Sequence, residues 1–303
     1  MKHILILLLL PAMLFLQQCA DQPAEVNEPA PASDTLLATI DSIAKEYDAR
    51  IGVAFCALDS GQVLSYHGKE KFTMMSVVKF PQALAMLSLA DRKLVDLNAF
   101  LQFTKEDMQR QTYSPMRDSL KGKPSALTMR ETITYAVGSS DNLACDKLFT
   151  LFTPHEVDSF FHGLRYTDMG IGTNYADITD STISKNWSTP ECMAQVLTDF
   201  ANGSILSDSS TQFLLNVMTE TTNPANRLKG QLPPTAAVAH KTGTMSVIDG
   251  VIPAFNDVGI VTLPNGKRYV IAVFVNDSKE DEATSAEAIA RISLAVWSYF
   301  EQQ

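Results

Sequence analysis

The chain has 303 residues, of which 46% are apolar and 19% are charged, a composition typical of a folded globular protein and not of a disordered one. Its formal charge of -10 argues against nucleic acid as a partner, because phosphate binding needs a basic face and 34 Asp and Glu outnumber 24 Lys and Arg.

The first residues have the form of an export signal. A short basic start precedes an apolar run, residues 4–16, that is too short to span a bilayer comfortably. The stretch ending in Cys19 resembles a loose bacterial lipobox, so we expect residues 1–18 to be removed as a lipoprotein signal peptide and Cys19 to be lipidated; ordinary signal cleavage nearby is the alternative. Residues 19–34 contain three prolines and predict a flexible tether. This start predicts a periplasmic, membrane-anchored lipoprotein.

The remaining elements follow from hydrophobic spacing and turn residues. Apolar residues at helical spacing predict a helix at 35–47, and β-rich runs at 51–58 and 63–67 predict a hairpin. The middle of the chain has few strand signals, and it fits helices at 76–94, 128–137, 141–152, 154–161, 189–201 and 207–218. Strand signals return at 236–244, 257–263 and 269–276, and an amphipathic helix is expected at 285–300.

This order of elements predicts an α/β (α+β sandwich) fold. An antiparallel sheet with flanking helices would be built from both chain ends, with an all-helical lobe inserted between them. We expect one catalytic domain at 35–303, with the sheet lobe at 35–72 and 220–303 and the helical lobe at 73–219. The cleft between two such lobes is the expected ligand site.

Cysteine and histidine give no sign of a metal site. Beyond Cys19 the chain has Cys56, Cys145 and Cys192, an odd number that cannot pair completely, and each lies in an apolar or helical stretch. We expect buried free thiols. No spacing among them and the five His suggests zinc, and we expect neither a metal nor a cofactor.

A nucleophile candidate appears at the start of the first long internal helix. Ser76 and Lys79 form an S-x-x-K pair, and residues three apart share a helix face, so the lysine can reach the serine oxygen. Such a pair occurs by chance about once per chain of this length, and Ser42 with Lys45 is another. Taken alone, Ser76 is better explained as a serine that caps the start of the helix.

Two further motifs distinguish Ser76 from Ser42. The tripeptide starting at Ser140 reads Ser-Asp-Asn, and the one starting at Lys241 reads Lys-Thr-Gly. Each is expected by chance in under roughly one chain in ten, so the three motifs together, in this order, point to a shared site.

The residue types in these motifs suit acyl transfer. A serine hydroxyl needs a base, and Lys79 can serve if burial or nearby positive charge lowers its pKa. Ser140 can relay a proton to a departing nitrogen, and Asn142 can bind a substrate amide. Lys241, Thr242 and Thr244 can bind a carboxylate. The backbone N–H groups of Ser76 and Thr244 are the candidate oxyanion hole.

The three motifs together resemble those of class A serine β-lactamases and penicillin-binding proteins, within the penicillin-recognising serine enzymes. The likeness extends from about Leu36 to the C-terminus, and the runs at 186–190 and 241–244 look most like the Bacteroidetes-type branch. The resemblance implies a sheet lobe with a helical lobe, a β-lactam substrate, no metal, and the roles given above. Residues 112–115 look like an aromatic cleft wall, so Tyr113 is a substrate-wall candidate, although simple surface packing explains it equally well.

The chain departs from this pattern on the omega loop. Class A enzymes carry a glutamate there that activates the hydrolytic water, and residues 157–190 contain no glutamate. Counting back without gaps from Asn186 puts that position at Thr173 and the position four residues later at Asp177. Asp177, or else Asp180, could supply the base, since Asp and Glu share their chemistry. Alternatively deacylation is slow, or the acyl acceptor differs.

The leading expectation is therefore a class A-type serine β-lactamase that acts as a monomer on small β-lactams. The alternatives are a penicillin-binding or D-alanyl-D-alanine peptidase-like protein and a β-lactam binder that releases its ligand slowly. The preferred antibiotic class depends on loop geometry that the sequence does not give.

Overall fold

The computed structural model describes residues 31–59, 61–179 and 181–303, and its centre is a five-stranded antiparallel sheet. The strand order is β2-β1-β10-β9-β8, so the first strands pair with the last ones. The bounds are β1 Arg50–Ala57, β2 Leu64–Tyr66, β8 Ala237–Thr244, β9 Ile252–Thr262 and β10 Arg268–Ser278. The predicted sheet from both chain ends is confirmed. β9 begins earlier than the apolar pattern indicated, because buried Asn256 and Asp257 interrupt that pattern.

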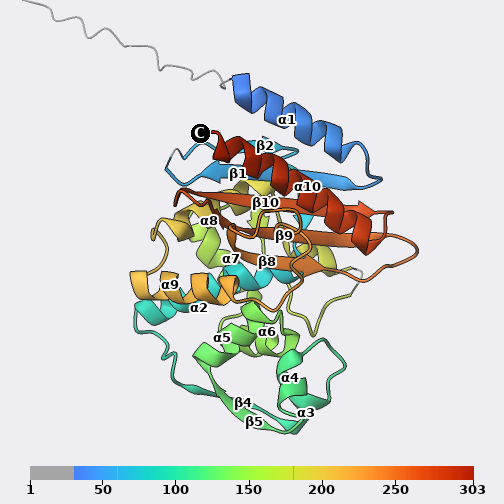
Figure 1. Ribbon diagram of the computed structural model, residues 1–303. Coiled ribbons are helices and arrows are strands. Elements are labelled where there is room, and N and C mark those ends of the chain that lie inside the picture. Colours follow the sequence, from blue (N-terminus) through green and yellow to red (C-terminus); the bar gives the residue numbers. More distant parts are fainter. Residues whose placement is uncertain (1–30, 60, 180) are drawn as a thin grey trace, which may run out of the picture.

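Helices lie over both faces of the sheet, as Figure 1 shows, and residues on both faces are buried. Helices α1 (Pro31–Ala44) and α10 (Glu282–Glu301) cover one face, and α8 (Pro190–Ala201) covers the other. Side chains of a strand alternate between the two faces, so Val53 and Phe55 join the core under α1 and α10, whereas Ala54 and Cys56 join the core of the helical lobe. The sheet is thus the wall shared by two hydrophobic cores.

The helical lobe is packed around one buried helix. In α2 (Lys79–Asp91) every side chain from Lys79 to Leu87 is buried, as expected for a helix with neighbours on all sides. α5 (Met129–Gly138), α7 (Pro154–Gly163) and α9 (Asp208–Thr219) pack against it. The other helices of the lobe are α3 Lys105–Gln109, α4 Pro115–Ser119 and α6 Asn142–Phe149. Thr128 and Thr153 begin α5 and α7 with capping boxes, in which each side chain accepts from the backbone of the first turn.

Several short strands were not predicted. β4 (Phe100–Phe103) pairs with β5 (Ser125–Thr128), and β3 (Phe72–Thr73), β7 (Trp187–Ser188) and β6 (Met169–Gly170) form a small second sheet. Strands of two to four residues are too short to show an alternating pattern in sequence.

The structure describes only the last part of the expected tether. α1 begins at Pro31, so residues 31–34 of the expected tether are helical. The expected signal peptide, Cys19 and the tether up to residue 30 lie outside the described residues. Within the described ranges, no helix has the length and apolar character needed to cross a membrane. Cys56, Cys145 and Cys192 form no disulfide with one another; the first two are buried and the third is half-buried.

The sheet and the helical lobe also meet where β8 contacts η1 (Met75–Val78), a short 3-10 helix. A Cβ added to Gly243 would collide with the carbonyl oxygen of Met74 and lie 3.2 Å from the backbone nitrogen of Ser76. Glycine is required here because two backbones approach each other without room for a side chain.

We expect Gly243→Ala to lower the free energy of unfolding by about 1–3 kcal/mol, because the neighbouring atoms are backbone and cannot yield by rotating. Denaturant unfolding measures the change. Gly163→Ala is the matched control, since its Cβ would meet nothing within 4 Å. Equal unfolding midpoints for Gly243→Ala and the parent protein would contradict close contact between β8 and η1.

Candidate active site

A cavity of about 520 Å³ lies between the open edge of β8 and the helical lobe. Six of the predicted site residues line it, and two predicted lysines, Lys79 and Lys241, are fully buried beside it. The predicted residues that line the cavity are Ser76, Tyr113, Ser140, Asn142, Thr242 and Thr244. The structure therefore brings together three motifs that lie far apart in the sequence.

Ser76 lies in the short 3-10 helix η1, and Lys79 is the first residue of α2, which follows it directly. Lys79 Nζ lies 3.1 Å from Ser76 Oγ. The same nitrogen donates to the carbonyl oxygen of Ser140 and to Asn142 Oδ1, both at 2.6 Å. Burial lowers the pKa of Lys79 to about 8, against the opposing charges of nearby carboxylates. An amine with this pKa is available as a base close to neutral pH.

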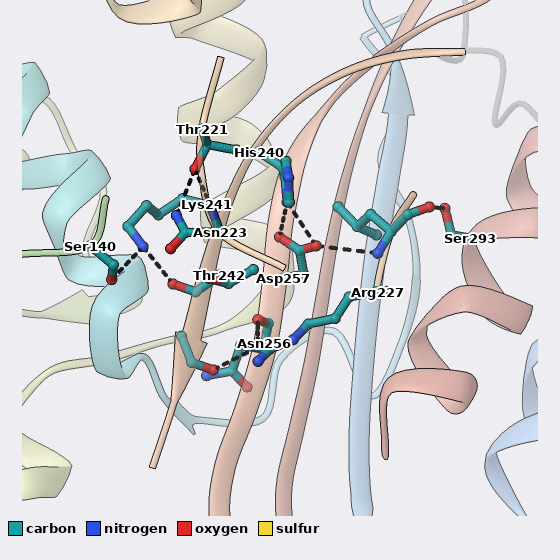
Figure 2. Close-up of polar contacts among 12 residues, drawn as sticks. Ser140, Thr221, Asn223, Arg227, His240, Lys241, Thr242, Asn256, Asp257 and Ser293 are labelled. Atoms are coloured by element: carbon teal, nitrogen blue, oxygen red, sulfur yellow. Dashed lines mark hydrogen bonds and ion pairs between the residues drawn. The ribbon is translucent and has the colours of Figure 1, made fainter. Parts of the chain in front are cut away.

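Ser140 follows α5 in a left-handed backbone conformation, with φ of 56°. This conformation is unusual for a residue with a side chain, and it directs the Ser140 carbonyl to Lys79 while the hydroxyl faces Lys241. Lys241 Nζ donates to Ser140 Oγ at 2.9 Å, as Figure 2 shows. Burial first, and then the charge of Lys79, lower the pKa of Lys241 well below its ordinary value. A ligand carboxylate at this position would offset both effects.

Asp141 fixes the loop that carries Ser140. Its buried carboxylate accepts from Ser114 Oγ at 2.7 Å, from the Met116 N–H at 2.8 Å and, as the N-cap of α6, from the Ala144 N–H at 2.8 Å. The middle residue of the Ser-Asp-Asn motif is thus an anchor and does not line the cavity.

Asn142 and Tyr113 form the wall beside this loop. Asn142 Oδ1 accepts from Lys79, and its amide nitrogen donates to Thr112 Oγ1 at 3.0 Å. The Asn142 N–H donates to the Tyr113 carbonyl oxygen at 3.0 Å, which holds the Tyr113 segment against α6. The Tyr113 side chain is 61% exposed and lines the cavity, so its ring is free to contact a ligand.

Two backbone N–H groups fit the expected oxyanion hole. The N–H of Ser76 lies in the first turn of η1, where helical N–H groups have no partner within the helix. The N–H of Met245 donates to Ala254 in β9, and successive N–H groups of a strand point to opposite sides, so the N–H of Thr244 points to the open edge. Gly243 places this edge directly against Ser76.

Arg227 is a site residue that the sequence did not reveal. Its buried guanidinium donates to the carbonyl oxygens of Gly243 and Asn256 and to Thr244 Oγ1 at 2.6 Å, and the residue lines the cavity. Burial lowers the pKa of Arg227 to about 10. It adds positive charge at the Thr244 end. Arg227 lies in an irregular polar loop, where no periodic pattern marks a buried side chain.

His240 and Asp257 form a buried pair behind β8. His240 Nδ1 lies 2.9 Å from both oxygens of Asp257, and Figure 2 shows His240 pointing away from Lys241. The negative charge of Asp257 raises the pKa of both Lys241 and Arg227, against the effect of their burial. This pair thus supports the cationic side of the cavity from below.

The loop after β6 does not present the residues expected from the sequence. Thr173 is buried, and its backbone N–H and carbonyl both bond to the Asn186 side chain. Asp177 is exposed and is not among the residues that line the cavity, and Asp180 lies outside the described residues. The structure does not bring Asp177 to Ser76, and its role as a base stays a prediction.

Tyr175 faces the nucleophile instead. Its hydroxyl lies 2.9 Å from Ser76 Oγ, and Lys79 Nζ lies 4.2 Å from the centre of its ring. A lone tyrosine in a polar loop matches no motif, so the sequence did not single it out. The available signal was its place two residues after the expected glutamate position.

Comparisons with known proteins agree with this geometry. Residues 35–300 match the model of the β-lactamase enzyme family. The chain is 37% identical over 273 residues to β-lactamase VEB-1 of Pseudomonas aeruginosa, covering 88% of this chain and 91% of that protein. It is similar to the crystal structure of a β-lactamase from Chitinophaga pinensis, with a TM-score of 0.85, 37% identity, and coverage of 87% of this chain and 98% of the other.

A class A β-lactamase structure from Bacteroides cellulosilyticus matches with a TM-score of 0.86 and 31% identity, covering 91% of this chain and all of the other. The family match, these relatives and the placement of the three motifs around one cavity agree. The chain belongs to the β-lactamase enzyme family, in its class A branch.

Proposed function

We propose that the protein is a serine β-lactamase, a hydrolase that opens the β-lactam amide through an acyl-enzyme on Ser76. The observation that carries this function is the contact of the buried amine of Lys79 with Ser76 Oγ, beside a second buried lysine, Lys241, in contact with Ser140. Relatives named β-lactamases support the substrate class, and the activity would contribute to antibiotic resistance.

Lys79 is suited to act as the base for acylation. When its amine is neutral, its two N–H groups can keep the short bonds to Ser140 and Asn142, which leaves the lone pair facing the Ser76 hydroxyl. Ser76 Oγ then bonds to the lactam carbonyl carbon as its proton passes to Lys79. The developing oxyanion lies between the N–H groups of Ser76 and Thr244.

Ser140 is suited to protonate the leaving nitrogen. As the carbon–nitrogen bond breaks, the nitrogen takes the Ser140 hydroxyl proton, and Lys241, bonded to the same oxygen, replaces it. The substrate carboxylate fits the cationic end of the cavity, where Lys241, Thr242, Thr244 and Arg227 are close together. Asn142 and Tyr113 flank the opposite wall as contacts for the substrate.

Export and anchoring are the second part of the proposal. The basic and apolar N-terminus and the lipobox-like stretch before Cys19 support a lipid-anchored periplasmic protein, which we expect to be a monomer.

Rates of acylation should rise with pH and level off above about pH 8. Only neutral Lys79 can accept the Ser76 proton, and its pKa is about 8, so each unit below that value removes about nine-tenths of the active form. Single-turnover reaction with a chromogenic cephalosporin between about pH 6 and about pH 9 measures this. A rate that is constant over that range would contradict Lys79 as the base.

Ser76→Ala should abolish covalent attachment of a β-lactam, because no other hydroxyl among the described residues accepts a hydrogen bond from Lys79 Nζ. Intact mass after incubation with benzylpenicillin is the measurement. Ser42→Ala is the matched control, since Ser42 is the exposed serine of the other S-x-x-K pair, in α1, and its change should leave the adduct intact. An adduct on Ser76→Ala would show that the nucleophile is elsewhere.

Cys19→Ser should move the full-length protein from the membrane fraction to the soluble periplasmic fraction, because the lipid chains would have no attachment point. Fractionation and immunoblotting of cells that express both forms measure this. If the parent protein is already soluble, simple signal cleavage is the correct interpretation.

A further inference from the structure

Tyr175 is held in place at the nucleophile by hydrogen bonds that join its loop to α6. Its backbone N–H donates to Asp146 Oδ1 at 2.6 Å, and the other oxygen of Asp146 accepts from Arg110 at 2.6 Å. Asp146 belongs to α6, the helix that Asn142 begins. The position of Tyr175 is therefore tied to the same helix that fixes Lys79, and its contact with Ser76 is part of the site's construction.

The chemistry of a phenol differs from that of a carboxylate at this position. Loss of water around the ring raises the pKa of Tyr175 well above its ordinary value, so the hydroxyl keeps its proton. A neutral phenol can donate to Ser76 Oγ and stabilise the negative charge that develops there during attack. It cannot remove a proton from water near neutral pH.

In the described part of the chain, no carboxylate contacts Ser76 or Lys79 and could remove the proton from water in place of Tyr175. Asp146 and Asp141 are engaged with Arg110 and with the α6 cap. Glu282 is the one carboxylate among the described residues that line the cavity, and it lies beside Arg227, where its charge raises the Arg227 pKa.

We propose that Tyr175 is the loop residue that faces the Ser76 ester, and that it assists acylation but not hydrolysis, so that the acyl-enzyme is the species that accumulates with β-lactams. This inference rests on the proposed function, because it concerns the second half of the same reaction. The β-lactam ester on Ser76 would then be released slowly.

Hydrolysis of the Ser76 ester needs a group that accepts a proton from the attacking water. A water oxygen must bond to the ester carbon, a base must take its proton, and the bond between that carbon and Ser76 Oγ must break as Ser76 regains a proton. Tyr175 leaves Lys79 as the acceptor for the water proton. Lys79 has already taken the Ser76 proton during acylation and donates to two acceptors at 2.6 Å, so it can accept the water proton only after it has lost its own.

The test separates acylation from release. Protein is mixed with a chromogenic cephalosporin in a stopped-flow instrument and with benzylpenicillin in acid-quenched samples for intact mass. The parent protein should give a burst of about one equivalent followed by slow turnover, with most of the protein carrying the adduct. Because Lys79 is then the proton acceptor, its release rate should fall about tenfold per pH unit below about pH 8, without the plateau between about pH 8 and about pH 5 that a carboxylate base would give.

Two changes at Tyr175 should act on different steps. Tyr175→Glu places a carboxylate where the ring now lies next to Lys79, and it should speed release at least tenfold and add a loss of release below about pH 5. Tyr175→Phe keeps the ring and should slow acylation roughly fivefold while release stays within about twofold. Tyr166→Phe is the matched control, since it removes a phenol bonded to Asp199 away from the cavity and should change neither rate.

The outcomes distinguish this inference from the proposed function. A parent protein that never carries an adduct overturns the proposed function. A parent protein that is acylated and deacylated without accumulation of the adduct overturns the inference alone. A folded Tyr175→Glu variant with an unchanged release rate does the same. A tenfold slower release in Tyr175→Phe, Asp177→Asn or Glu282→Gln would identify another proton acceptor and overturn it too. If Tyr175→Glu does not fold, the Tyr175→Phe rates and the parent pH profile still decide.

Discussion

The buried amine of Lys79 is the interaction on which the site depends. An ammonium group removed from water is unfavourable unless its protons have acceptors, and Lys79 meets this need with the Ser140 carbonyl, Asn142 Oδ1 and Ser76 Oγ. These three oxygens come from η1 and from the loop before α6. Because all three oxygens must lie within hydrogen-bond distance of the same nitrogen, the position of each residue restricts the positions of the others.

The hydrogen bond of Lys79 to Ser140 also restricts the position of Lys241. Ser140 uses its carbonyl for Lys79 and its hydroxyl for Lys241, and its left-handed backbone makes this division possible. Such a conformation costs on the order of 1–3 kcal/mol for a residue with a side chain, and buried Asp141 offsets part of this cost through three hydrogen bonds to the surrounding loop. Burial lowers the pKa of both lysines, and the charge of Lys79 lowers that of Lys241 further. Because both lysines bond to Ser140, they are placed to exchange protons.

The sequence predicted the parts of the fold and site that depend on local pattern. The long strands and helices have clear periodicity, and the three motifs have fixed spacing, so the sequence predicts that Ser76, Lys79, Ser140, Asn142 and Lys241 share one site. Arg227 and Tyr175 were not, because each reaches the cavity from an irregular loop whose path depends on tertiary contacts. Thr173, which the gapless count puts at the glutamate position, is held by its backbone to the Asn186 side chain. Tyr175, two residues later, contacts Ser76 instead.

The pairing of β1 with β10 has a consequence for how the chain reaches its final state. Every residue of β1 from Arg50 to Ala57 has its partner in the last quarter of the sequence, between Tyr269 and Asn276. Contacts of such large sequence separation form late, after the entropy of closing a long loop has been lost. The serine-bearing helical lobe therefore cannot dock on a finished sheet until the C-terminal strands have been made. A chain that ends before residue 269 because of a nonsense codon would lack β10, the partner of β1. Its β1 would expose an unpaired apolar edge.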